Sequence, residues 1–95
     1  MAIVDISIVP IGTKSPSVSD YVRKSIKLIK RSGLKYQVGP MGTTVEGNLS
    51  DIFELVLQLH KAQMKMGVKR ILTTIKIDDR RDKKQSMEDK VKAVL

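Results

Sequence analysis

The order of two hydrophobic periodicities most restricts how this 95-residue chain can fold. Apolar residues alternate with a period of two, typical of strands, in residues 2–9, 34–40, 42–48 and 69–78. They recur with the period of an amphipathic helix in residues 18–32 and 48–67, and residues 79–95 follow as a charged turn and a short helix. The order strand, helix, strand, strand, helix, strand predicts an α+β chain with the ferredoxin-like βαββαβ fold. We expect one domain, residues 1–95, that ends in a short helix.

Two helices can cover only one face of such a sheet, so the opposite face is predicted to be open. In the first strand, the apolar side that faces the helices consists of Ala2, Val4, Ile6 and Ile8. The open face is expected to carry Ile3, Asp5, Ser7, Val9, Gln37, Thr44, Glu46, Leu72, Thr74 and Lys76. This mixture is too polar for a core and too apolar for plain solvent, which predicts a ligand pocket, a subunit interface, or both.

The second predicted helix, residues 48–67, has two apolar sides. One side consists of Ile52, Leu55, Val56, Leu59 and Met66. The other consists of Phe53, Leu57, His60 and Met64. A monomer needs only one such side buried, so the second predicts a contact between subunits.

The helix ends are also predicted from single residues. The expected caps are Ser17 or Ser19 for the first helix and Asn48 or Ser50 for the second. Gly33 and Gly67 are expected to end the two helices, because glycine readily adopts the left-handed conformation found there.

Missing residue types exclude several kinds of chemistry. The chain has no cysteine, so a disulfide framework, a thiolate metal site and a cysteine nucleophile are excluded. His60 is its one histidine, and no hydrolase, zinc-protease or phosphate-loop motif is present. We therefore expect a noncatalytic protein without a metal or cofactor. No stretch approaches the roughly 20 apolar residues of a membrane span, and no signal peptide is recognised, so we expect a cytoplasmic protein without a membrane partner.

The formal net charge of +8 is concentrated in one part of the chain. Between Lys14 and Lys35, seven basic residues accompany one acid, Asp20, and contribute +6 of the total. Most of them lie on the outer side of the first predicted helix, where a solvated charged surface is the commoner meaning of such a pattern. The strands carry almost no aromatic residues on which RNA bases could stack. Nonspecific nucleic-acid binding is therefore kept only as the last alternative.

The stretch GPMGTTVEGN, residues 39–48, predicts a hairpin turn with a carboxylate in the strand that follows. Its glycines permit the sharp backbone, but they do not explain Glu46. A carboxylate on a sheet face has to be paired, hydrogen-bonded or available to a ligand. Lys76 on the same face would be its partner in an ion pair, and a bound ligand is the alternative.

Three segments together resemble the small thiamine-binding protein family, which is related to the YkoF-type proteins. They are VPIGTKSPSVSDYV (residues 9–22), MGTTVEG (residues 41–47) and RILTTIKIDDRRDKK (residues 70–84). The likeness extends from Ile3 to Val94. It implies a ferredoxin-like subunit that forms a homodimer or a tetramer of two dimers. It also implies binding of thiamine or its hydroxymethylpyrimidine part without a known reaction.

The resemblance and the strand pattern together indicate candidate ligand-binding residues. The family motif suggests Met41, Gly42, Thr43 and Glu46, and strand geometry adds Asp5 and Ser7. A carboxylate and a threonine hydroxyl could bind the polar edge of an aminopyrimidine, and acidic groups would favour the thiazolium cation of thiamine. The alternative is an oligomeric interaction module without a small-molecule ligand, in which Asp5, Glu46 and Lys76 pair at interfaces.

Overall fold

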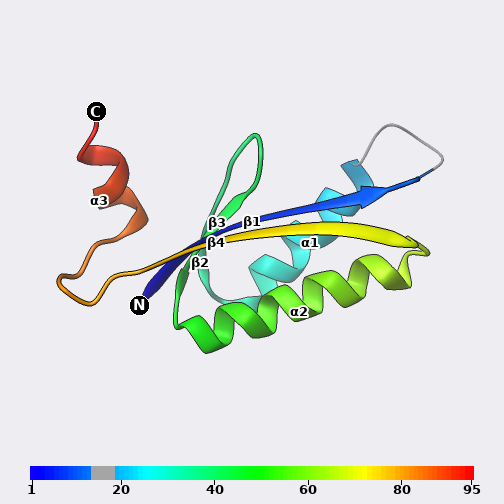
Figure 1. Ribbon diagram of the computed structural model, residues 1–95, viewed down its shortest axis with the longest axis horizontal. Coiled ribbons are helices and arrows are strands. Elements are labelled where there is room, and N and C mark those ends of the chain that lie inside the picture. Colours follow the sequence, from blue (N-terminus) through cyan, green and yellow to red (C-terminus); the bar gives the residue numbers. More distant parts are fainter. Residues whose placement is uncertain (14–18) are drawn as a thin grey trace.

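The computed structural model describes residues 1–13 and 19–95 and has the predicted order of elements (Figure 1). The strands are β1 (Ala2–Ile11), β2 (Lys35–Val38), β3 (Thr43–Gly47) and β4 (Arg70–Asp79). The helices are α1 (Ser19–Ser32), α2 (Leu49–Lys65) and α3 (Met87–Lys92). The predicted α+β, ferredoxin-like architecture is therefore confirmed.

The four strands form one antiparallel sheet in the order β2-β3-β1-β4. Val4 of β1 lies opposite Val45 of β3 and Ile77 of β4, and residues opposite one another share a face of the sheet. This face packs against α1 and α2. Its core consists of Ala2, Val4, Ile6, Ile29, Val45, Ile52, Leu55, Val56 and Leu59. The alternation in the sequence therefore predicted the buried face correctly.

The ends of the helices follow from local chemistry. Gly33 and Gly67, just after α1 and α2, have φ values of +75° and +86°, which side chains other than glycine rarely tolerate. The side chain of Asn48 caps α2 by accepting a hydrogen bond from the backbone N–H of Ser50 at 2.9 Å. The alternative cap of α1, Ser17, lies outside the described residues, as does Val18.

The buried side of α2 differs from the prediction at its C-terminal end. Met66 is 40% exposed, because it follows the last helical turn and no longer shares the direction of the core residues. Gln63 is buried instead, and its amide donates hydrogen bonds to the carbonyl of Tyr21 at 3.0 Å and to Ser25 Oγ at 3.1 Å. A polar side chain thus joins the two long helices, because hydrogen bonds offset part of the cost of burying it.

On the second apolar side of α2, three of the four side chains are exposed and His60 is half-buried, and the subunit contact expected there stays a prediction. Phe53 and Leu57 are both 47% exposed and Met64 is 43% exposed. Such side chains are available for contact with another protein surface.

The sheet face away from α1 and α2, called the open face below, is less open than predicted. The start of α3 packs against it, and Met87 is only 4% exposed. Val91 remains half exposed, and Val94 and Leu95 are exposed because the helix has ended at Ala93. The sequence shows a short helix but not the sheet face on which it packs. Within residues 1–13 and 19–95, no helix is long and apolar enough to cross a membrane.

Candidate functional site

The β2–β3 hairpin decides which side chains reach the open face. The backbone N–H of Gly39 donates to the carbonyl of Gly42 at 2.8 Å and closes the turn. Counting outward from this turn places Gln37 opposite Thr44 and Lys35 opposite Glu46. These four side chains lie on the open face, because Tyr36 and Val45 between them face the helices.

Gly42 allows the hairpin to approach β1 closely. A Cβ atom at this position would lie 3.0 Å from the carbonyl oxygen of Ile6 and 3.4 Å from Asp5 Oδ1. Because the first of these atoms belongs to the backbone, it cannot rotate away from an added methyl group. The glycine therefore lets the hairpin backbone lie directly beside the Asp5 carboxylate.

Asp5 is the most available carboxylate at the centre of the open face. Thr44 Oγ1 donates to Asp5 Oδ1 over a long distance of 3.4 Å. Lys76 lies opposite Asp5 in the sheet register, yet the two form no ion pair in the described part of the chain. A hollow of about 410 Å³ lies here, lined by Asp5, Gln37, Thr44 and Lys76 of the sheet and by Met87 and Lys90 of α3. We call it the open-face site.

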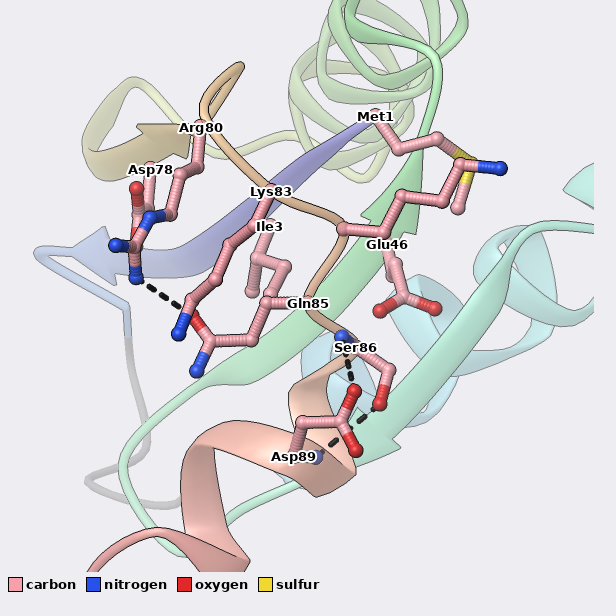
Figure 2. A pocket seen from close by; sticks show the side chains of 10 residues that line it. Met1, Ile3, Glu46, Asp78, Arg80, Lys83, Gln85, Ser86 and Asp89 are labelled. Atoms are coloured by element: carbon pink, nitrogen blue, oxygen red, sulfur yellow. Dashed lines mark hydrogen bonds between the residues drawn. The ribbon is translucent and has the colours of Figure 1, made fainter.

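Glu46 is on the same face, but its carboxylate is already occupied. Glu46 is 6% exposed, and its Oε1 accepts a hydrogen bond from the backbone N–H of Met87 at 2.9 Å. Its Oε2 lies 3.2 Å from Lys35 Nζ. Figure 2 shows the Glu46 side chain reaching from β3 toward the segment that leads into α3. The ion pair expected with Lys76 is therefore wrong, since Lys35 is directly opposite Glu46 in the hairpin register.

Charged contacts hold α3 against the sheet around Glu46. Lys35 Nζ also lies 2.6 Å from Glu88 Oε2, and this hydrogen bond, together with Glu46, raises the pKa of Lys35. The same bond lowers the pKa of Glu88. On the other side of α3, Lys90 Nζ lies 2.6 Å from Asp78 Oδ2 of β4. These contacts fix α3 as one wall of the open-face site.

The start of α3 is stabilised by a capping box. Ser86 Oγ accepts from the backbone N–H of Asp89 at 3.1 Å, and Asp89 Oδ2 accepts from the backbone N–H of Ser86 at 3.0 Å. The hydrogen bond from the Ser86 backbone is the main reason why the pKa of Asp89 is lowered. A six-residue helix thus keeps a defined beginning next to Glu46.

The remaining predicted site residues lie elsewhere. Thr43 is buried on the side of the sheet that faces the helices, because it lies opposite Ile6. Met41 at the hairpin tip is 87% exposed. A separate hollow of about 340 Å³ between the hairpin and α1 is lined in part by Ser7, Met41, Gly42 and Thr43. The structure therefore brings Asp5 and Gly42 together but distributes the six candidates over three hollows.

Two neighbours of Asp5 were not named among the candidate ligand-binding residues. Thr44 and Gln37 line the open-face site, and both were expected on this face. The signal that could have identified them is the hairpin register, which aligns Gln37, Thr44 and Asp5 across three adjacent strands. In the described part of the chain, no group of three or more His, Cys, Asp or Glu side chains could hold a metal ion.

Comparison with known proteins identifies relatives over nearly the whole chain. Residues 4–95 match the sequence profile of a family described as thiamine-binding protein. The UPF0045 protein YqgV of Bacillus subtilis is 46% identical over 98 residues, which covers 99% of this chain and 94% of the relative. The UPF0045 protein ECM15 of Eremothecium gossypii is 46% identical over 92 residues, covering 97% and 88%.

Solved structures agree with the fold. A Methanocaldococcus jannaschii protein of 38% identity superposes with a TM-score of 0.90, covering 98% of this chain and 94% of that one. A Thermotoga maritima protein, whose description proposes a role in thiamine biosynthesis or salvage, has a TM-score of 0.81 at 29% identity, covering 97% and 96%.

Proposed function

Because the chain belongs to the thiamine-binding protein family, we propose that it binds thiamine or its hydroxymethylpyrimidine part noncatalytically at the open-face site. The observation that supports this location is the Asp5 carboxylate, which is exposed and, among residues 1–13 and 19–95, accepts only a long hydrogen bond from Thr44. A ligand with hydrogen-bond donors can therefore bind Asp5 without first displacing an ion pair.

The chemistry of the site suits an aminopyrimidine. Asp5 can accept a hydrogen bond from the exocyclic amine, while Gln37 offers both a donor and an acceptor to the ring edge. Ile3 and Val91 line the same hollow and provide apolar surface for the faces of the ring. The positive thiazolium of thiamine would be attracted to Asp5 as well.

Two cations also line the site and limit this attraction. Lys90 is neutralised by Asp78 at 2.6 Å. Lys76 has no ion pair in the described part of the chain, but it is exposed, and its long side chain can turn its ammonium into solvent. Lys76 therefore weakens the attraction for the thiazolium, and the proposal rests mainly on the hydrogen bonds that Asp5 can accept from the aminopyrimidine.

The other predicted site residues have supporting roles in this proposal. Gly42 lets the hairpin lie beside Asp5, and Ser7 follows Asp5 on the same face of β1. Glu46 holds the start of α3, which forms one wall of the site. Met41 and Thr43 shape the hairpin rather than contact the ligand directly.

We also propose that the protein assembles into a homodimer or a tetramer of two dimers through the exposed apolar side of α2. Phe53, Leu57 and Met64 carry this proposal, because about half of each side chain is exposed on one helix. An assembly module without a ligand is the second candidate function, and these same side chains favour it. A cytoplasmic location stays a prediction.

Isothermal titration calorimetry against thiamine and hydroxymethylpyrimidine tests the binding proposal. We expect saturable binding in the micromolar range, about −8 kcal/mol. Asp5→Asn should weaken binding at least tenfold, because it removes the negative charge without changing the size of the side chain. The matched control is Asp51→Asn, which removes an exposed carboxylate from α2 on the other face of the sheet, outside the lining of the hollow, and should bind like the wild type.

Two results would count against this proposal. Equal affinity of the wild type and Asp5→Asn for thiamine would show that the ligand does not bind to Asp5. No binding of either compound by the wild type would favour the assembly module.

A further inference from the structure

The third of these hollows lies beside the beginning of α3. It has a volume of about 340 Å³ and is formed by the start of β1, the end of β4 and the loop of residues 80–86 (Figure 2). Ile3 contributes apolar surface to it, and Glu46 lies at its edge. We call it the loop pocket. Its volume is within the range that binds small organic molecules.

Each carboxylate that lines the loop pocket already has a partner. Glu46 is held by Lys35 and by the backbone N–H of Met87. Asp78 is paired with Lys90 at 2.6 Å, and Asp89 accepts from the Ser86 backbone as part of the capping box. The negative charges in the pocket wall are therefore compensated or hydrogen-bonded within the protein.

Two of the cations in the pocket wall have no such partner. Arg80 is bound by both carboxylate oxygens of Asp82, at 2.6 and 2.8 Å. Lys83 and Lys84, by contrast, form no ion pair within residues 1–13 and 19–95, and both line the pocket. In this part of the chain, the pocket wall thus has two cations without an ion pair and one such carboxylate, Asp89, so its unpaired charge is positive on balance.

The loop also holds a hydrogen-bond donor in place. Arg80 Nη1 donates to the side-chain oxygen of Gln85 at 3.3 Å, as the dashed line in Figure 2 shows. With its oxygen occupied, the Gln85 amide keeps its NH₂ group available for an acceptor. The Arg80–Asp82 pair stabilises the loop that presents Lys83, Lys84 and Gln85 together.

We propose that the loop pocket binds a small organic anion, a phosphate group carried on an apolar body. Lys83 and Lys84 supply positive charge for the phosphate, the Gln85 amide supplies a donor, and Ile3 contacts the apolar part. A divalent cation fits poorly, since the carboxylates here are already engaged. Ile3 lines both hollows, but the proposal does not depend on thiamine binding at Asp5, because the groups that bind the phosphate, Lys83, Lys84 and Gln85, line only the loop pocket.

Phenyl phosphate is a suitable probe, because it combines the two chemical features in one molecule. We expect saturable binding in calorimetry at low ionic strength, weaker binding of inorganic phosphate, and no detectable binding of phenol. The double variant Lys83→Gln, Lys84→Gln should lose at least tenfold in affinity. The matched control, Lys61→Gln with Lys65→Gln, removes the same charge from exposed positions of α2 and should bind phenyl phosphate like the wild type.

Amide chemical shifts locate the probe. Binding in the loop pocket should shift the amides of Lys84, Gln85 and Ser86, which line this pocket and not the open-face site, in ¹⁵N spectra of the wild type. Equal weakening by both double variants, or shifts confined to the basic side of α1, would show a general attraction of anions and overturn the proposal. Absence of saturable binding would overturn it as well. Asp5→Asn should bind phenyl phosphate normally, so failure at one site is distinguishable from failure at the other.

Discussion

Two carboxylates on the open face, Asp5 and Glu46, have similar chemistry but very different surroundings. They lie on adjacent strands, yet Glu46 is buried under α3 and engaged by two donors, whereas Asp5 is exposed beside a hollow. The difference arises from α3, which covers one end of the face and leaves the other accessible. A carboxylate on a sheet therefore serves structure or ligand binding according to the donors that the rest of the fold brings to it.

Removal of each carboxylate should separate these roles most clearly. Glu46→Ala is expected to reduce the free energy of unfolding by about 2–3 kcal/mol, because it leaves the buried N–H of Met87 without an acceptor. Asp5→Ala should change it by less than about 0.5 kcal/mol, as is usual for exposed positions. Urea unfolding followed by circular dichroism measures both. Equal losses in the two variants would contradict the assigned roles.

Gly42→Ala tests the close approach of the hairpin to Asp5. The added methyl group would lie 3.0 Å from the backbone oxygen of Ile6, so we expect a loss of about 1–2 kcal/mol in urea unfolding and weaker thiamine binding. In Gly47→Ala, the control, the methyl group would meet the flexible end of Leu34 at 2.9 Å. This variant should lose less stability. A larger loss of stability in Gly47→Ala than in Gly42→Ala would show that the close approach of the hairpin to β1 does not require a glycine at position 42.

Lowering the pH should destabilise α3, which covers one end of the open face, before it destabilises the sheet. The pKa values of Glu88 and Asp89 are lowered in the folded protein from ordinary values of 4.5 and 3.8. Their contribution to stability is therefore present above those values and is lost as the pH falls through the lowered ones. Hydrogen exchange at decreasing pH, corrected for the intrinsic rate, should show α3 losing protection first. Simultaneous loss in α3 and β1 would contradict this order.

The sequence predicts the fold well because its main signals are local. Alternation identifies the buried side of β1, including Val4 and Ile6, and glycine chemistry identifies the ends of α1 and α2. Gln63 was missed, because its burial depends on hydrogen bonds to another helix. Such a partner has no signature in the sequence of α2.

The candidate site is less predictable, because it depends on how distant segments pack. Alternation correctly places Asp5 and Glu46 on one face, but only the packing of α3 shows that Glu46 is occupied. Counting residues outward from the centre of the hairpin turn places Lys35 opposite Glu46, so this partner could have been identified from the sequence. The family motif, by contrast, includes Thr43, whose side chain lies on the opposite face of the sheet.

The most direct test of the division between Asp5 and Glu46 is a thiamine titration of the ¹⁵N-labelled protein, followed through its backbone amide shifts. Our account predicts that the amides of Asp5, Gln37 and Thr44 shift progressively and saturate, while the amide of Met87 keeps its hydrogen bond to Glu46 and shifts little. Large shifts centred on Glu46 and Met87, with none at Asp5, would show that the ligand displaces α3 and would contradict the account.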